Sequence, residues 1–277
     1  MDALLEEFAK ELAEKTACLD SDPHLWMPFT LKEADYVAVM AKKSVSADEA
    51  AAHWGRMKAF REKFLPSGGP MLGCVDVGQD TYWWDYGRLE LYYNNNILLT
   101  DSSDSAHALR TFMYLHAAGA PREDTSGRRK GNQLADSVTI DPSAVVVNCR
   151  LGGGTVGPKC VLVNVTAPSI EAKESVVMCV SSSVPVTCEG AVLYNAVEDT
   201  GASLDCNGVR ADVFMPGGTQ HKMKSKLSID GGKAWKEVVE GNPMSFEGIY
   251  KANGVLDVAE CSAEAQKAHK AVSSKVA

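Results

Sequence analysis

The chain has 277 residues, 45% of them hydrophobic, and a formal net charge of −8. Its length suits one large domain or two modest ones, and its acidic balance argues against nucleic acid or an anionic membrane surface as a partner. No apolar run reaches the roughly 18 residues of a membrane-spanning helix, so we expect no membrane span.

The first 65 residues predict helices. One apolar face with helical spacing is formed by Leu4, Leu5, Phe8 and Leu12. Pro23 and Pro28 are expected to interrupt the helical pattern, which then resumes in two segments up to residue 64. Ser46, with Glu49 three residues later, predicts a capping box at the start of the last of these helices.

Residues 65–120 lead from a loop into the end of a strand, a tight turn and two helices. The turn is expected around Asp85, and the helices are expected in residues 89–99 and 105–119. A charged, turn-rich stretch follows. We therefore assign residues 1–120 to a helical or α+β region and residues 121–136 to a linker.

Between Ser137 and Val213 an apolar pattern recurs in five segments, which open at Ile140, Val156, Ile170, Val186 and Leu204. Two positions later stand small or ring-constrained residues that suit a sharp corner, namely Pro142, Pro158, Ala172, Cys188 and Cys206. A second column, expected to point inward, comprises Val147, Val163, Val177, Leu193 and Ala211. Such a degenerate repeat predicts the stacked coils of a parallel β-helix over residues 137–215.

The last part of the chain, residues 216–277, predicts a hairpin and a helical tail that caps the open end of the coils. The fold class is therefore α+β: a mostly helical N-terminal region, a parallel β-helix and a C-terminal helical cap. Asn148, Asn164 and Asn195 recur late in successive coils and predict an internal asparagine ladder.

The eight cysteines contain no CxxC pair. Five of them fall in the repeats, where a small and slightly apolar side chain fits a stacked core: Cys149, Cys160, Cys179, Cys188 and Cys206. We therefore predict free thiols and a reducing compartment, either cytoplasmic or similar to an organelle stroma.

The segment Tyr82-Trp83-Trp84-Asp85-Tyr86-Gly87, with the helix after it, resembles the aromatic-Trp-x-Asp-x-Gly turn near the end of the catalytic domain of sugar-1-phosphate nucleotidylyltransferases. In the ADP-glucose pyrophosphorylase branch, that helix leads through a linker into a left-handed parallel β-helix, and the same order occurs here over residues 73–213. The resemblance implies the C-terminal portion, or a catalytically incomplete homologue, of an enzyme of nucleotide-sugar synthesis. Its β-helix would serve oligomerisation or regulation.

By this resemblance, Asp85 helps to hold a Mg²⁺ that bridges the phosphates of the nucleotide and the sugar. Arg88 stands where the family has Thr, and it either contacts a phosphate as a cofactor-binding residue or pairs with Glu90. The implied chemistry is in-line attack of a sugar phosphate oxygen on the α-phosphorus, with the metal neutralising the developing charge. The implied ligand is a sugar phosphate or a nucleotide sugar.

A Gly-rich loop that opens a helix would be needed to cradle the nucleotide phosphates. Four Gly-rich segments occur, and none follows an N-terminal strand; they begin at Pro66, Leu151, Pro216 and Asp230. Residues 152–154 are expected to form a coil corner instead. We therefore expect no nucleotidyl transfer from this chain by itself, and its status as an enzyme stays open.

Parallel β-helices also form acyltransferases, which use a histidine base, and γ-class carbonic anhydrases, which bind zinc through three histidines. No histidine lies between residues 137 and 213, so both activities are disfavoured. The alternative that remains is a non-enzymatic β-helical scaffold, which assembles with itself as a dimer or trimer or with a larger complex.

Overall fold

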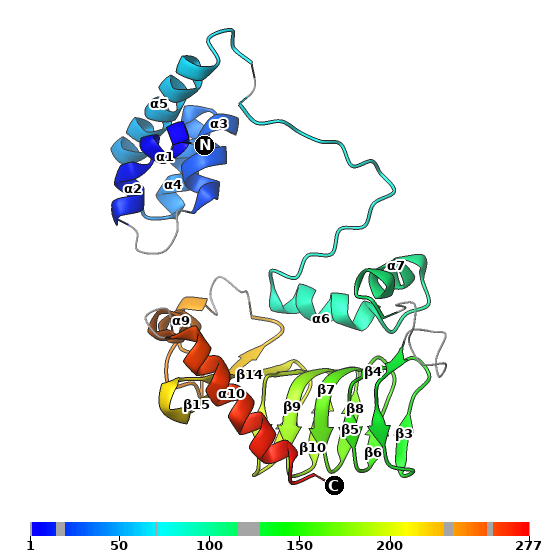
Figure 1. Cartoon of the computed structure of the whole chain (residues 1–277). Coiled ribbons are helices and arrows are strands. Elements are labelled where there is room, and N and C mark those ends of the chain that lie inside the picture. Colours follow the sequence, from blue (N-terminus) through cyan, green and yellow to red (C-terminus); the bar gives the residue numbers. More distant parts are fainter. Residues whose placement is uncertain are drawn as a thin grey trace. The chain divides into compact units, whose positions relative to one another are not determined.

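The computed structural model describes residues 2–14, 20–69, 71–115, 128–229, 235–253 and 257–276. The chain forms two compact units, one up to Thr81 and one from Tyr82 onward (Figure 1). Residues 121–127 of the expected linker lie outside the described residues. Within the described ranges, no helix combines the length and the apolar character needed to cross a membrane.

The first unit is helical, as predicted. Its elements are α1 (Asp2–Glu7), α2 (Ala9–Glu14), the π-helical turn η1 (Asp22–Trp26), α3 (Met27–Thr30), α4 (Glu33–Lys42) and α5 (Ala47–Phe64). Tyr36 and Met40 of α4 pack on Ala50 of α5. The capping box is confirmed, because the Ser46 side chain accepts from the Glu49 N–H while Glu49 accepts from the Ser46 backbone.

The prolines stay out of helix interiors, as expected, but the segment that contains them is itself helical, contrary to the predicted break. Pro23 lies in the first turn of η1 and Pro28 in the first turn of α3. A helix tolerates proline there because the first-turn N–H groups have no partner within the helix.

The second unit is a parallel β-solenoid of about 5 turns, as the repeat predicts (Figure 1). Its strands are β1 (Arg129–Lys130), β2 (Gln133–Leu134), β3 (Val138–Ile140), β4 (Val145–Val147), β5 (Arg150–Leu151), β6 (Gly154–Val156), β7 (Val161–Ala167), β8 (Ile170–Lys173), β9 (Val176–Ser182), β10 (Val186–Glu189), β11 (Val192–Tyr194), β12 (Val197–Glu198), β13 (Ala202–Leu204), β14 (Gly208–Phe214) and β15 (Gln220–Lys226). One sheet has the order β13-β10-β8-β6-β3. The other follows β1-β4-β7-β9-β11-β14-β15, with β2, β5 and β12 paired beside it.

On the five-stranded sheet the coils stack with a constant spacing of 16 residues, in the column Ile140, Val156, Ala172, Cys188 and Leu204. The predicted alignment is therefore wrong by two residues at two steps. Ile170 pairs with Gly154 rather than Val156, and Leu204 pairs with Cys188 rather than Val186. A shift of two keeps each side chain on the same face, so the openers still point inward. For the same reason Ala172 and Cys188 lie in strands and not at corners.

The second predicted column mixes residues of two faces, because a register error of a single residue reverses the face. The residues stacked on Val147 and Val163 are Met178 and Tyr194, on the outer face. Val177 and Leu193 point inward, as predicted, stacked on Val146 and Leu162 and buried in the solenoid core. Ala211 pairs with Tyr194 and therefore lies on the outer face, contrary to the prediction. The cause is coil length, because this sheet's successive pairs are spaced by 15 to 17 residues.

Residues in the left-handed conformation mark one corner of the coils: Asn148, Asn164, Cys179 and Asn195. Asparagine tolerates this conformation better than most residues. Only one step of the predicted ladder forms, since Asn148 Nδ2 donates to Asn164 Oδ1 at 2.6 Å, and this pair lies at an exposed corner rather than inside. Cys179 occupies the next position of the corner, and Asn195 Nδ2 donates to the Asp212 carbonyl instead. The predicted glycine corner also exists. A Cβ on Gly154 (φ 102°) would lie 2.0 Å from the Ile170 carbonyl oxygen.

Three of the five repeat cysteines lie in the core: Cys149, Cys160 and Cys188. Burial raises the pKa of Cys149 and Cys160 to about 11 and that of Cys188 to about 12, so all three stay neutral thiols. Cys179 and Cys206 lie at corners and are more accessible. The described cysteines are free thiols, as predicted; Cys18 lies outside the described residues.

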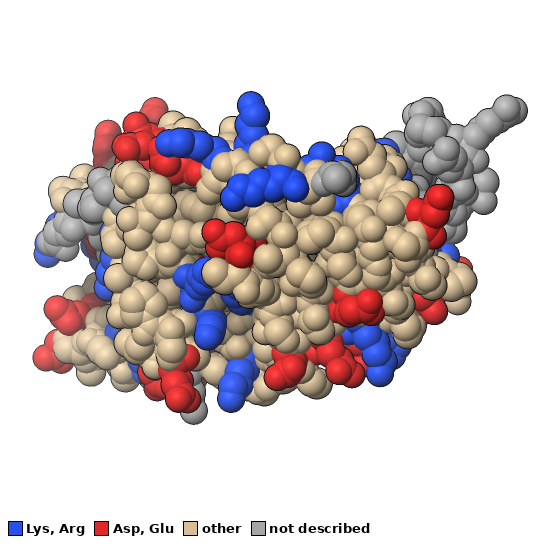
Figure 2. Space-filling view, turned by 90° about the horizontal axis from the view of Figure 1, so that it is seen from below, with Lys and Arg blue, Asp and Glu red and all other residues tan. Residues whose placement is uncertain are grey.

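The described helices of this unit include α6 (Leu89–Leu98), α7 (Asp104–Phe112), the 3-10 turn η2 (Pro216–Gly218), α9 (Phe246–Asn253) and α10 (Val258–Ser273). The outer face of β4, β7, β9, β11 and β14 is covered by α6 and α7 (Figure 1). The tail is helical, as predicted, and α10 lies against β9, β12 and β14. The predicted helical cap over the open end of the coils is replaced by a strand: β15 pairs antiparallel with β14 of the last coil. On the face shown in Figure 2, acidic and basic side chains are interspersed.

Candidate ligand-binding groove

The turn at Asp85 is held by hydrogen bonds within itself and to α6. Asp85 Oδ1 accepts the Gly87 N–H at 2.7 Å, and Asn95 Nδ2 donates to the Asp85 carbonyl at 2.5 Å. The residues before the turn form no strand, contrary to the predicted strand end. Arg88 is the N-cap residue of α6 and its side chain is exposed.

Asp85 is not part of a complete set of metal ligands among the described residues. The described residues contain no group of three or more His, Cys, Asp or Glu side chains that would hold a metal, and one Asp85 oxygen already accepts from the turn. Protein-bound Mg²⁺ usually takes one or two carboxylates together with substrate phosphates. The described residues therefore form no complete metal site by themselves, and the assignment of Asp85 to Mg²⁺ stays a prediction.

A groove of about 290 Å³ opens beside this turn. One wall is the start of α6, from Tyr86 to Tyr92, and the floor is the outer face of β14 and β15 around Val209 and Ser225. Val209 and Ser225 are opposite each other in the antiparallel pair, so their side chains share this face. Trp235 and Phe246 complete the lining, which is mostly apolar.

Two polar atoms in this lining are buried without a partner. Neither Tyr86 Oη nor Ser225 Oγ has a hydrogen bond with any residue that the structure describes. Ser225 is only 5% exposed. A buried polar group left unpaired costs about 1–3 kcal/mol, so each of these two hydroxyls gains free energy from a partner that a water or a ligand supplies.

The tyrosine hydroxyls in the groove are protonated at neutral pH. Burial raises the pKa of Tyr86. Burial, followed by the neighbouring Tyr194 and Cys179, raises the pKa of Tyr92 to about 12. Tyr92 already donates to Met178 Sδ at 3.2 Å. Tyr86 therefore remains as a free phenol donor, and Ser225 both donates and accepts.

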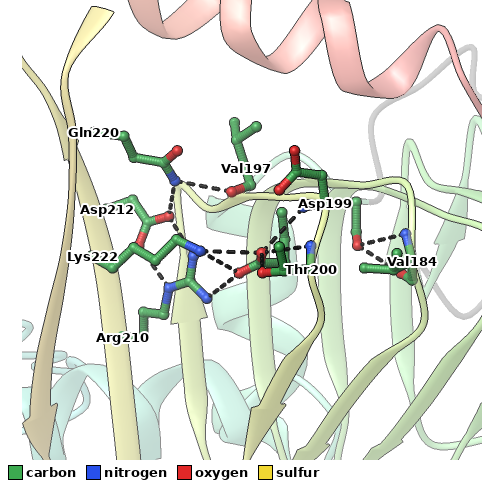
Figure 3. A network of polar contacts seen from close by, with 10 residues as sticks. Val184, Val197, Asp199, Thr200, Arg210, Asp212, Gln220 and Lys222 are labelled. Carbon is green, nitrogen blue, oxygen red and sulfur yellow. Dashed lines mark hydrogen bonds and ion pairs between the residues drawn. The ribbon is translucent and has the colours of Figure 1, made fainter.

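A second polar cluster lies inside the last coil (Figure 3). Arg210 occupies the inward column, stacked on Leu193. It donates to Asp212 through Nε at 2.8 Å and a terminal nitrogen at 2.7 Å, and to Glu198 at 2.8 Å. Lys222 of β15 reaches the same Glu198 at 2.9 Å. We call these four residues the end network.

The end network satisfies its own charges. Glu198 is 1% exposed, and Thr200 adds a hydroxyl and a backbone donor to its carboxylate. Burial by itself raises the pKa of Glu198, but hydrogen bonds from Thr200, Arg210 and Lys222 outweigh burial and lower that pKa to about 2. Two carboxylates thus balance two cations, and we assign the network a structural role.

Of the residues singled out from the sequence, the structure brings Arg88 to the groove and leaves Asp85 in the turn beside it. Tyr86 was part of the quoted motif but had no assigned role, and Ser225 was missed. The signal for Ser225 is the alternation of β15, in which the buried Met223 and Ser225 lie between exposed lysines. A serine on the buried face of such a strand is a candidate polar contact.

The comparisons with known proteins add no relative. No protein-family model, curated protein sequence or solved structure matches this chain. The β-helix is established by the structure itself, and membership of the nucleotidylyltransferase family stays a prediction.

Proposed function

We propose that the solenoid unit binds a small phosphorylated, hydroxyl-rich ligand, a sugar phosphate or a nucleotide sugar, in the groove beside α6. The observation that carries the proposal is the pair of unpartnered hydroxyls, Tyr86 Oη and Ser225 Oγ, which line one groove with Arg88. The unit would then act as a regulatory module of nucleotide-sugar metabolism.

Each part of the ligand meets a suitable group. The Arg88 guanidinium presents several N–H donors that match the oxygens of a phosphate. Tyr86 and Ser225 bond sugar hydroxyls, and the rings of Tyr92 and Trp235 offer apolar surface to the face of a sugar or a base. Affinity therefore depends on both ends of the ligand.

Isothermal titration calorimetry tests this proposal, with glucose 1-phosphate and ADP-glucose as probes and with glucose and inorganic phosphate as half-ligand controls. We expect at least one phosphorylated probe to bind more tightly than both controls. Arg88→Ala should weaken binding about tenfold, and Tyr86→Phe about fivefold, because each removes one hydrogen-bonding group.

Lys236→Ala is the matched control, since Lys236 is exposed and does not line the groove. Equal binding by wild type and Arg88→Ala would contradict the proposal. The same preparations also test catalysis: we expect no magnesium-dependent release of pyrophosphate from ATP and glucose 1-phosphate. Release that Asp85→Ala abolishes would instead show the enzyme implied by the resemblance.

A second candidate function, self-assembly, has its own supporting observation. One large apolar side chain of the second unit is almost fully exposed beside the Asp85 turn: Trp83 (91%). An exposed tryptophan of this size is a candidate contact for a second copy of the chain. We expect light scattering to give a dimer or trimer of the 29.7 kDa chain, and Trp83→Ser to shift the mass towards the monomer. A monomeric wild type would contradict self-assembly and leave the groove proposal intact.

A further inference from the structure

The two sheets of the solenoid end differently. The larger sheet is extended beyond the last coil by β15, and Asn242 covers the backbone of β15 by accepting from the Lys224 N–H and donating to the Lys224 carbonyl, at 2.7 and 2.8 Å. The five-stranded sheet ends at β13, and within the described residues no strand pairs with its outer edge. The backbone groups along that edge are therefore available to an additional strand.

A hollow of about 570 Å³ lies between the β13 edge and β15. Its wall on the β15 side carries Lys222, Lys224 and Lys226, which alternate along the strand and thus share one face. This is the inward face, because Lys224 lies opposite Arg210 in the antiparallel pair. The space where the next coil would stack is thereby lined by lysines.

The charge of this hollow is not neutralised locally. Lys222 pairs with Glu198, whose carboxylate is already shared with Arg210. Lys224 and Lys226 have no ion pair with the residues that the structure describes, and both are exposed. Asp205 is the other acidic residue of the lining. A strand entering the hollow would meet a net positive wall.

We propose that the β13 edge accepts an extended acidic segment of a partner protein, which adds a strand to the five-stranded sheet. Backbone hydrogen bonds to residues 202–204 supply the affinity. Acidic side chains at alternate positions face Lys224 and Lys226 and supply the specificity. A segment of acidic and β-branched residues in strict alternation has the required period.

Fluorescence anisotropy with three labelled peptides of equal length tests this proposal at low ionic strength. The first alternates Asp with Thr, the second alternates Lys with Thr, and the third alternates Asp with Pro. The third keeps the charge of the first but lacks the alternate N–H donors of a strand. We expect the Asp-Thr peptide to bind at least tenfold more tightly than either of the others.

Lys224→Glu combined with Lys226→Glu should weaken binding of the Asp-Thr peptide at least tenfold, whereas Lys236→Glu, outside the hollow, should leave it unchanged; circular dichroism checks that the variants are folded. If the Asp-Pro peptide binds as tightly, or if inorganic phosphate at equal charge displaces the peptide, the hollow is a small-anion site and the proposal is overturned. The peptide comparison needs no variant. Its outcome is also independent of sugar phosphate binding in the groove beside α6.

Discussion

The groove beside α6 and the end network both bury polar groups near the last coil, but only the network provides these groups with hydrogen-bond partners. In the network, every charge of Arg210, Asp212 and Glu198 is met by a partner within 3 Å. In the groove, Tyr86 Oη and Ser225 Oγ find no partner among the described residues. Satisfied polar groups stabilise a fold, whereas unsatisfied ones carry a cost that a ligand can remove.

The contrast separates stability from function on the same pair of strands. Arg210 and Ser225 lie on adjacent strands, β14 and β15. We expect variants of the end network to change folding and variants of the groove to change binding.

Arg210→Met should have the largest effect on stability. It leaves the carboxylates of Glu198 and Asp212 buried without their shared cation, which should lower the free energy of unfolding by about 3–5 kcal/mol. Arg88→Met is the matched control, because that exposed side chain should change stability by less than about 0.5 kcal/mol. Urea denaturation measures both, and equal midpoints would refute the structural role of the network.

Acid should weaken the same network. The pKa of Glu198 is lowered from its ordinary 4.5 to about 2 in the folded protein, so this carboxylate contributes stability that is fully present above pH 4.5. The contribution, about 3 kcal/mol, is lost as the pH falls from 4.5 to about 2. Glu198→Gln should flatten the pH dependence of unfolding in this window. If the free energy of unfolding of the variant falls with pH as steeply as that of wild type, other groups govern acid unfolding.

Ser225→Ala should have a smaller effect of opposite sign. Because the Ser225 hydroxyl has no partner, its removal should raise the free energy of unfolding by about 1 kcal/mol in the absence of ligand. Ser181→Ala is the matched control. Ser181 is also buried, but its hydroxyl bonds His269 of α10 at 3.0 Å, so its removal should destabilise by a similar amount. Destabilisation by both variants would indicate that Ser225 has a structural partner.

Much of the fold was accessible from the sequence because alternation and caps are local signals. The Ser46 and Glu49 box and the inward openers of the coils needed only spacing. The register of Ile170 and the faces of Val147 and Val163 were not accessible, because corners gain or lose a residue and pairing between coils decides the alignment. The insertion or loss of one residue at a corner cannot be recognised in a single sequence with a degenerate repeat.

The candidate site was predictable only in part. Arg88 was identified from its place in the motif, but its neighbour Ser225 lies 137 positions later in the chain and joins the groove only because β15 folds back on β14. The sequence around Arg210 likewise predicts an ordinary surface residue, and only its pairing with Leu193 shows that it lies in the inward column. Sites made by long-range pairing leave little local signal.

The most direct measurement is the ligand-induced change in thermal unfolding of wild type and of the double variant Tyr86→Phe/Ser225→Ala. Each protein is measured with the phosphorylated probe that binds wild type more tightly, at about a hundred times the dissociation constant for wild type. Wild type should gain about 2.7 kcal/mol at that excess. The double variant should be more stable without ligand and gain much less with it. An equal gain in both proteins would contradict the assignment of the groove as the binding site.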